Sequence, residues 1–254
     1  MISDEAGAAD PAAPGPGPRG LPAVGFRWWE TLLAYILGNV FIGGLALGFL
    51  GAAKPEVAPI REVVGAVVLD LVFAGSLVVW LGNVHPGSLR AIGVRVQARA
   101  VAVGAALGAV LYAVAAGLVG FILQWLYTQV LGHPVQAPDQ MPGGLSGAGT
   151  VLFVVLAVLI APVVEEFFFR GIVYRAVRDR HGVGAGLAFS AVLFGLVHYQ
   201  SGPLADSVLL QSVMVLTGVG LALIYERAGT LTASIAAHMA FNVIGVTLIL
   251  QARG

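Results

Sequence analysis

Cysteine is absent from this 254-residue chain, which excludes disulfide bonds, thiolate metal ligands and a cysteine nucleophile. Charge is also scarce, because Asp, Glu, Lys and Arg make up only 10% of the residues and their formal charges sum to zero. A soluble globular domain carries about 25% charged residues, so this composition is not that of a soluble domain. The neutral balance also provides no basic surface for nucleic acid, and we expect no nucleic-acid partner.

Long apolar runs dominate what is present. Hydrophobic residues make up 58% of the chain. A membrane-spanning helix needs about 20 mostly apolar residues. The chain has seven apolar runs near that length, at 29–50, 62–82, 101–124, 150–172, 183–199, 207–226 and 230–250. We therefore predict an all-α, polytopic integral membrane protein with about seven transmembrane helices in one bundle, whose first partner is the lipid bilayer.

Composition divides the chain into four regions. Residues 1–25 are rich in Ala, Pro and Gly and lack the basic start and apolar core of a signal peptide, which predicts a disordered tail. A three-span region follows at 26–125. The Pro- and Gly-rich segment 126–149 is a predicted loop, and a four-span region occupies 150–254. Glycines inside the spans, such as Gly104 and Gly108, are expected to let helices pack closely.

The distribution of Lys and Arg predicts the orientation. With the N-terminus inside, the inward segments hold ten of these residues and the outward segments hold three. Cytoplasmic loops of membrane proteins carry the excess of positive charge. We therefore predict a protein of the cell membrane with a cytoplasmic N-terminus.

Two adjacent carboxylates, Glu165 and Glu166, interrupt the fourth predicted span. A charge at the bilayer centre costs about 2.5–3.5 kcal/mol, so such residues are functional candidates. On a helix, Glu166 and Arg170 are about 40° apart and are expected to pair, whereas Glu165 points about 140° away from Arg170 and is left for chemistry. The alternative is a solvated helix end at the membrane surface, because Arg175 and Arg178 follow closely.

Two later spans also present polar faces. His198 shares a helix face with Phe194, and His238 shares one with Asn242, each pair at i, i+4 spacing. Taken alone, these side chains are typical of interfacial residues or interhelical hydrogen bonds. Together with the two glutamates they predict a polar chamber. Carboxylate and imidazole activate water or hold a metal, and Asn and imidazole donate hydrogen bonds to an oxyanion.

Three motifs occur in order on separate apolar spans: Glu165-Glu166-x-x-x-Arg170, Phe194-x-x-x-His198 and His238-x-x-x-Asn242. This pattern resembles the CPBP family, which comprises type II CAAX prenyl endopeptidases and the bacteriocin-processing or immunity proteins of the ABI family. The resemblance includes the run YERAGTLTASIAAHMAFN and covers residues 150–245, about 40% of the chain. The first three spans contribute no motif.

The resemblance implies an intramembrane endopeptidase that cleaves near the C-terminus of its substrate, with 150–254 as the catalytic region. By position, Glu165 and His198 would activate the attacking water. His238 and Asn242 would stabilise the oxyanion. The implied partner is a peptide or protein whose C-terminus is membrane-associated, and prenylated in the family.

The same resemblance assigns Glu166 and Arg170 to orienting the site. It leaves two ways of activating the water open. In one, Glu165 acts without metal. In the other, Zn²⁺ is held by Glu165, His198 and His238, with a fourth position for water. The ligands would come from three helices and there is no HExxH helix, which favours the metal-free alternative.

Two other functions remain alternatives at this point. One is a non-catalytic immunity or scaffold protein that uses the same fold to bind a partner. The other is an ion-coupled carrier that uses Glu165, Glu166 and Asp70, the last being a carboxylate in the second predicted span. A carrier predicts transport that responds to pH or membrane potential, and no proteolysis.

Overall fold

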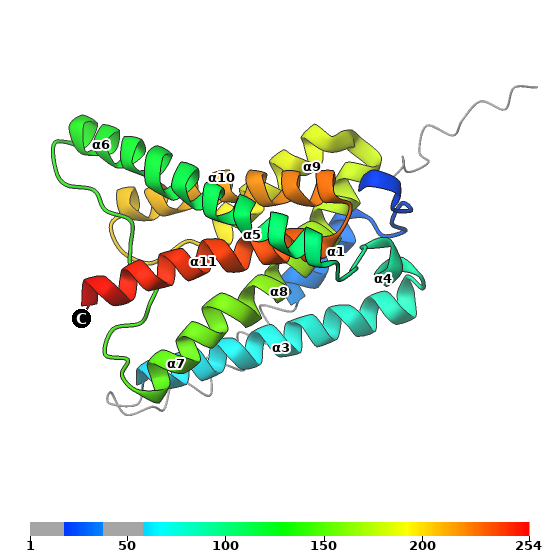
Figure 1. Ribbon diagram of the computed structural model, residues 1–254, viewed down its shortest axis with the longest axis horizontal. Coiled ribbons are helices and arrows are strands. Elements are labelled where there is room, and N and C mark those ends of the chain that lie inside the picture. Colours follow the sequence, from blue (N-terminus) through cyan, green and yellow to red (C-terminus); the bar gives the residue numbers. More distant parts are fainter. Residues whose placement is uncertain (1–17, 38–57, 254) are drawn as a thin grey trace, which may run out of the picture.

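The computed structural model describes residues 18–37 and 58–253, which form helices and no strand (Figure 1). Most of these helices run roughly side by side along the long axis of the molecule. Their bounds are η1 (Pro18–Gly20), α1 (Trp28–Leu37), α3 (Ala58–Val84), α4 (Ser88–Ala91), α5 (Ala98–Tyr112), η4 (Ala113–Val119), α6 (Gly120–Leu131), α7 (Ala148–Val155), η5 (Leu156–Ile160), α8 (Ala161–Glu166), η6 (Phe167–Tyr174), α9 (Arg175–Val197), α10 (Leu204–Ala228) and α11 (Leu231–Arg253).

Five helical runs among the described residues are long and apolar enough to cross a membrane. They are Pro59–Val84, Ala98–Leu131, Ala148–Val197, Leu204–Ala228 and Leu231–Arg253. The prediction of an all-α polytopic membrane protein is thereby confirmed, but the number seven is not. The first predicted span, 29–50, begins in α1 and continues outside the described residues. The fourth predicted span, 150–172, lies within the third run, and so does all of the fifth, 183–199, except its last two residues.

That third run is a helical hairpin rather than one straight helix. Its 50 residues would measure about 75 Å if straight, against a bilayer core of about 30 Å. Gly182 breaks the helix with φ 86° and ψ 168°, a conformation that side-chain-bearing residues rarely adopt. Beyond it the chain returns along itself, since the Ser190 hydroxyl donates to the Phe169 carbonyl at 2.9 Å. The two predicted spans are therefore antiparallel neighbours.

The helix that carries both glutamates is wound unevenly. α8 lies between two π-helical segments, η5 and η6. Pro162 stands at the start of α8 and has no N–H to donate to the preceding turn, which accounts for irregular winding just before it. Wider π-helical turns are frequent at functional sites. Here they flank Glu165 and Glu166 on both sides.

α5 lies directly against α11. A Cβ atom placed on Gly104 would be 2.2 Å from the Ala233 carbonyl oxygen, and one on Gly108 would be 2.0 Å from that of Ala237. Glycine alone permits this approach of two backbones, as the sequence predicted for these positions. Because Ala237 precedes His238, this contact also positions the part of α11 that carries the third motif.

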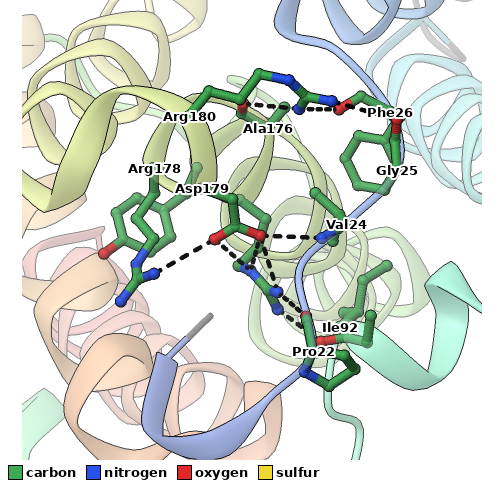
Figure 2. Close-up of polar contacts among 12 residues, drawn as sticks. Pro22, Val24, Gly25, Phe26, Ile92, Ala176, Arg178, Asp179 and Arg180 are labelled. Atoms are coloured by element: carbon green, nitrogen blue, oxygen red, sulfur yellow. Dashed lines mark hydrogen bonds and ion pairs between the residues drawn. The ribbon is translucent and has the colours of Figure 1, made fainter. Parts of the chain in front are cut away.

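The segment before α1 is bound to the end of the hairpin. The Val24 N–H donates to Asp179 Oδ2 at 3.0 Å, and Arg180 donates to the Phe26 carbonyl at 2.6 Å (Figure 2). We predicted a disordered tail over 1–25. Residues 1–17 of it lie outside the described part, whereas 18–25 are packed, with Leu21 and Val24 buried. Apolar contacts and main-chain hydrogen bonds to α9 hold this stretch in place.

Arg175 connects this N-terminal segment to α4 and α10. It forms an ion pair with Asp179 at 3.0 Å, and both side chains are fully buried. It also donates to the Ala91 carbonyl at 2.6 Å and to the Tyr225 hydroxyl at 3.2 Å. In the sequence, this arginine supported the alternative of a solvated helix end at the membrane surface. It is instead a buried side chain that links the N-terminal segment, α4 and α10.

Candidate active site

Glu166 is the centre of the polar group formed by the motif residues. Its Oε1 atom lies 2.8 Å from Arg170 Nη1 and 3.0 Å from His238 Nδ1. The side chains of Glu166 and Arg170 are fully buried, and that of His238 is 5% exposed. The pairing of Glu166 with Arg170, predicted from their spacing, is confirmed. The packing of α11 adds His238 to this pair from a position 72 residues away in the sequence.

Arg170 also joins three helices. Its Nη2 donates to the Gly218 carbonyl of α10 at 3.2 Å. Its guanidinium carbon lies 4.5 Å from the ring centroid of Phe194 on α9, a cation–π contact. A side chain held in this way is not part of a solvated helix end. The alternative interpretation of Glu166 and Arg170 as surface residues is therefore wrong, because packing of α9, α10 and α11 covers them.

Glu165 is not the carboxylate paired with Arg170, as the angular argument predicted. Its side chain is 28% exposed, and its Oε2 atom lies 3.9 Å from His238 Nε2. The imidazole of His238 is thus placed between two carboxylates, one on each nitrogen. A separation of 3.9 Å is too long for a direct hydrogen bond. It suits two groups that bind one water molecule between them.

His198 stands at the edge of this group. Its Nδ1 donates to the Phe194 carbonyl at 2.7 Å, which leaves Nε2 as the free acceptor nitrogen. The Phe194 ring centroid is 4.6 Å from that of His198 and 5.8 Å from that of His238. Within the described part of the chain, no hydrogen bond or ion pair joins His198 directly to Glu165. Phe194 therefore spaces the two histidines apart.

Asn242 lies one turn after His238 on α11. Its Nδ2 donates to the Ala157 carbonyl of η5 at 2.7 Å, which fixes the orientation of the amide. The residue also lines a cavity of about 510 Å³. The other walls are mostly apolar side chains, among them Tyr112, Phe121, Val213, Met214, Phe241 and Val246. A mostly apolar cavity therefore reaches the motif residues at Asn242.

Two residues outside the motifs also approach Glu165. Asp70 of α3 and Tyr35 of α1 both interact electrostatically with it. The Tyr35 ring stacks on Phe168 with centroids 5.2 Å apart, which packs α1 against η6. The sequence signalled Asp70, because it is a carboxylate within an apolar span. Nothing in the sequence singled out Tyr35, since an aromatic residue near a span end has many ordinary roles.

The fit of a zinc ion can be tested on the same side chains. The proposed ligands were Glu165, His198 and His238. Of these, Glu165 and His238 approach each other, but Phe194 separates His198 from them. The described residues contain no group of three or more His, Cys, Asp or Glu side chains placed to hold a metal ion. This arrangement does not fit a three-ligand zinc site, and no step below is assigned to a metal.

A comparison with protein-family models decides the classification of this region. Residues 147–244 match the family described as type II CAAX prenyl endopeptidase Rce1-like. This region is similar to an Rce1-like domain. The resemblance stated from the three motifs is confirmed, and at the level of the family the domain is of the CAAX intramembrane protease type. Comparisons with curated proteins and with solved structures gave no match.

All six motif residues of the candidate site lie within the Rce1-like domain. The groups that surround them do not all belong to it. Tyr35 and Asp70 lie on α1 and α3, before the matched residues begin. The N-terminal helices therefore complete the surroundings of Glu165 although they carry no motif.

Proposed function

We propose that the protein is an intramembrane endopeptidase that hydrolyses a peptide bond near the C-terminus of a membrane-associated substrate. The observation that supports this most directly is the position of His238. Its imidazole lies 3.0 Å from Glu166 and 3.9 Å from Glu165, and Glu165 is not the carboxylate paired with Arg170. One carboxylate thus orients the imidazole while the other remains available to a water molecule.

In the proposed reaction, Glu165 accepts a proton from a water molecule held beside His238. The resulting hydroxide adds to the carbonyl carbon of the peptide bond, and the carbonyl oxygen becomes an oxyanion. His238, in its imidazolium form, and the amide of Asn242 donate hydrogen bonds to that oxygen. When the carbon–nitrogen bond breaks, the proton on Glu165 passes to the leaving amine. His198 is assigned no contact with this water, because Phe194 spaces it away from His238.

The cavity at Asn242 supports a proposal for the substrate class. Its volume of about 510 Å³ is within the range of pockets that bind small organic groups. Its mostly apolar walls suit a lipid-linked or otherwise apolar C-terminal residue, with the peptide bond directed at the motif residues. A prenylated peptide is therefore the first substrate to test.

The test compares cleavage of a fluorogenic prenylated C-terminal peptide by the purified wild-type protein and by Glu165→Gln. The substitution keeps the size of the side chain and removes the base, so we expect at least a 10²-fold loss of kcat. Thermal unfolding should stay within about 1 kcal/mol of wild type, because Glu165 is not in the buried ion pair. Glu62→Gln, at an exposed position of α3, is the matched control and should cleave normally.

Three results would count against the proposal. Turnover retained in Glu165→Gln would exclude this residue as the base. Turnover abolished by a chelator and restored by Zn²⁺ would assign the water to a metal. Absence of cleavage by the wild-type protein, with prenylated and unprenylated peptides alike, would contradict a peptidase of this substrate class.

A further inference from the structure

A second cavity lies between α5 and α10, apart from the candidate active site. Its volume is about 750 Å³, and none of the six motif residues lines it. Its walls are chiefly apolar side chains: Val103, Leu107 and Val110 of α5, Val114 of η4, and Leu223 and Ile224 of α10. The four valine and leucine side chains of α5 and η4 are between 43% and 59% exposed, so the cavity is a groove on the apolar surface of the bundle.

The groove results from the way α5 packs. Gly104 brings α5 against the backbone of α11, so that its other side is not filled by α11. α5 meets α10 at Leu111, where a Cβ on Gly220 would lie 2.4 Å from the leucine Cδ1 atom. The groove runs from the N-terminal end of α5 past this contact to Val114 of η4. A surface of this kind inside a membrane is covered by lipid.

Two arginines stand at one end of the groove. Arg99 is in the first turn of α5, Arg227 is in the last turn of α10, and both line the cavity and are exposed. Within the described part of the chain, neither guanidinium forms a hydrogen bond or an ion pair. The chain as a whole is neutral, but these two arginines make this end of the groove locally positive. The groove therefore combines an apolar wall with an anion-binding end.

We propose that this groove binds an anionic phospholipid, with the phosphate between Arg99 and Arg227 and one acyl chain along α5. The length agrees, because the turns from Arg99 to Val114 span about 22 Å at about 1.5 Å per residue. One leaflet of the hydrocarbon core is about 15 Å thick, so an acyl chain is covered over its length. Basic pockets between helices at the cytoplasmic side of a membrane are sites for anionic head groups.

Charge selects the anionic lipid over other occupants. A zwitterionic lipid places a choline or ethanolamine cation beside the two guanidinium groups, which reduces its attraction. A free phosphate gains nothing from the apolar wall. The proposal concerns binding alone, so it is independent of the proposed peptidase activity.

The experiment is a lipid titration of the purified full-length protein, followed by native mass spectrometry, with phosphatidylglycerol and phosphatidylcholine of the same acyl chains. We expect phosphatidylglycerol to be retained preferentially. The affinity should fall about fivefold in Arg99→Gln and in Arg227→Gln, and about 25-fold in the double variant. Arg90→Gln is the matched control, because Arg90 is exposed and does not line the groove.

A second variant tests the apolar half of the site. Val103→Trp places a bulky side chain in the groove at a half-exposed position, so it should release the lipid while both arginines remain. Equal retention of the two lipids, an equal loss in Arg90→Gln, or displacement of the lipid by glycerol phosphate at equal concentration would overturn the proposal.

Discussion

Replacing Gly108 by alanine tests whether the contact between α5 and α11 positions the site. The added Cβ would lie 2.0 Å from the Ala237 carbonyl oxygen, 2.6 Å from its carbon and 2.7 Å from its Cα. Ordinary van der Waals contact begins at 3.4 Å, so the two helices must separate by about 1.4 Å. All three atoms belong to backbone, and no side-chain rotation relieves the clash. The shift is therefore passed to His238, the next residue of α11.

Two quantities should change together. Forcing an extra methyl group into a packed interface costs about 1–3 kcal/mol, so the free energy of unfolding in detergent should fall by that amount. Displacing a catalytic group by about 1 Å lowers the rate about 100-fold, and we expect a loss of that order in cleavage of the prenylated peptide. The assays are thermal or denaturant unfolding and single-turnover peptide cleavage on the same preparation.

Gly117→Ala is the matched control in the same helical run. A Cβ at Gly117 would have the Tyr112 carbonyl oxygen at 3.8 Å as its nearest atom, which is an ordinary contact. This variant should be as stable as wild type, or more stable by about 0.5–1 kcal/mol, because alanine favours a helix over glycine. If Gly108→Ala matched Gly117→Ala in both assays, the close approach of α5 and α11 would be refuted.

Two further predictions concern ion pairs outside the candidate active site. Arg175→Gln should lower the free energy of unfolding by about 1–3 kcal/mol, measured by thermal unfolding, because the buried carboxylate of Asp179 loses its Arg175 partner and keeps only Arg178, at 3.5 Å, as an ion-pair partner. If the free energy of unfolding fell no further than it does in Arg90→Gln, this prediction would be contradicted. Arg253→Gln breaks a largely exposed ion pair with Asp139 and should change stability by less than about 1 kcal/mol. Arg253→Gln should nevertheless speed thermolysin cleavage within 132–147, because Arg253 also donates a hydrogen bond to the Met141 carbonyl in that segment. An unchanged cleavage rate would contradict a role for Arg253 in holding the segment.

Local spacing was enough to predict one half of the candidate site. The pairing of Glu166 with Arg170, which leaves Glu165 outside the pair, follows from the angle between residues on one helix, and the structure has this pairing. The sequence did not decide whether the Glu166–Arg170 pair is buried, because it also allowed a solvated helix end. Only the packing of Phe194 and Gly218 around Arg170 decides that the pair is buried.

The contacts between helices that are distant in the sequence could not be predicted from it. The three motifs predicted a chamber, but they did not predict that His238 lies between the two carboxylates while His198 is spaced away by Phe194. The separation between Asp70 and Glu165 along the chain is likewise too large for any periodicity to relate them. Such contacts depend on which helix faces pack, and many pairings have similar apolar area.

The sequence by itself determined that this is an all-α membrane protein with an Rce1-like set of motifs, because composition and local spacing carry those properties directly. The tertiary structure decided where the chain reverses, at Gly182, and which groups meet. It also decided that Arg175 and Asp179 are buried and that Arg99 and Arg227 share the end of a groove. The physical reason is that charge in an apolar chain is stable only where packing supplies a partner, and packing is a property of the whole bundle.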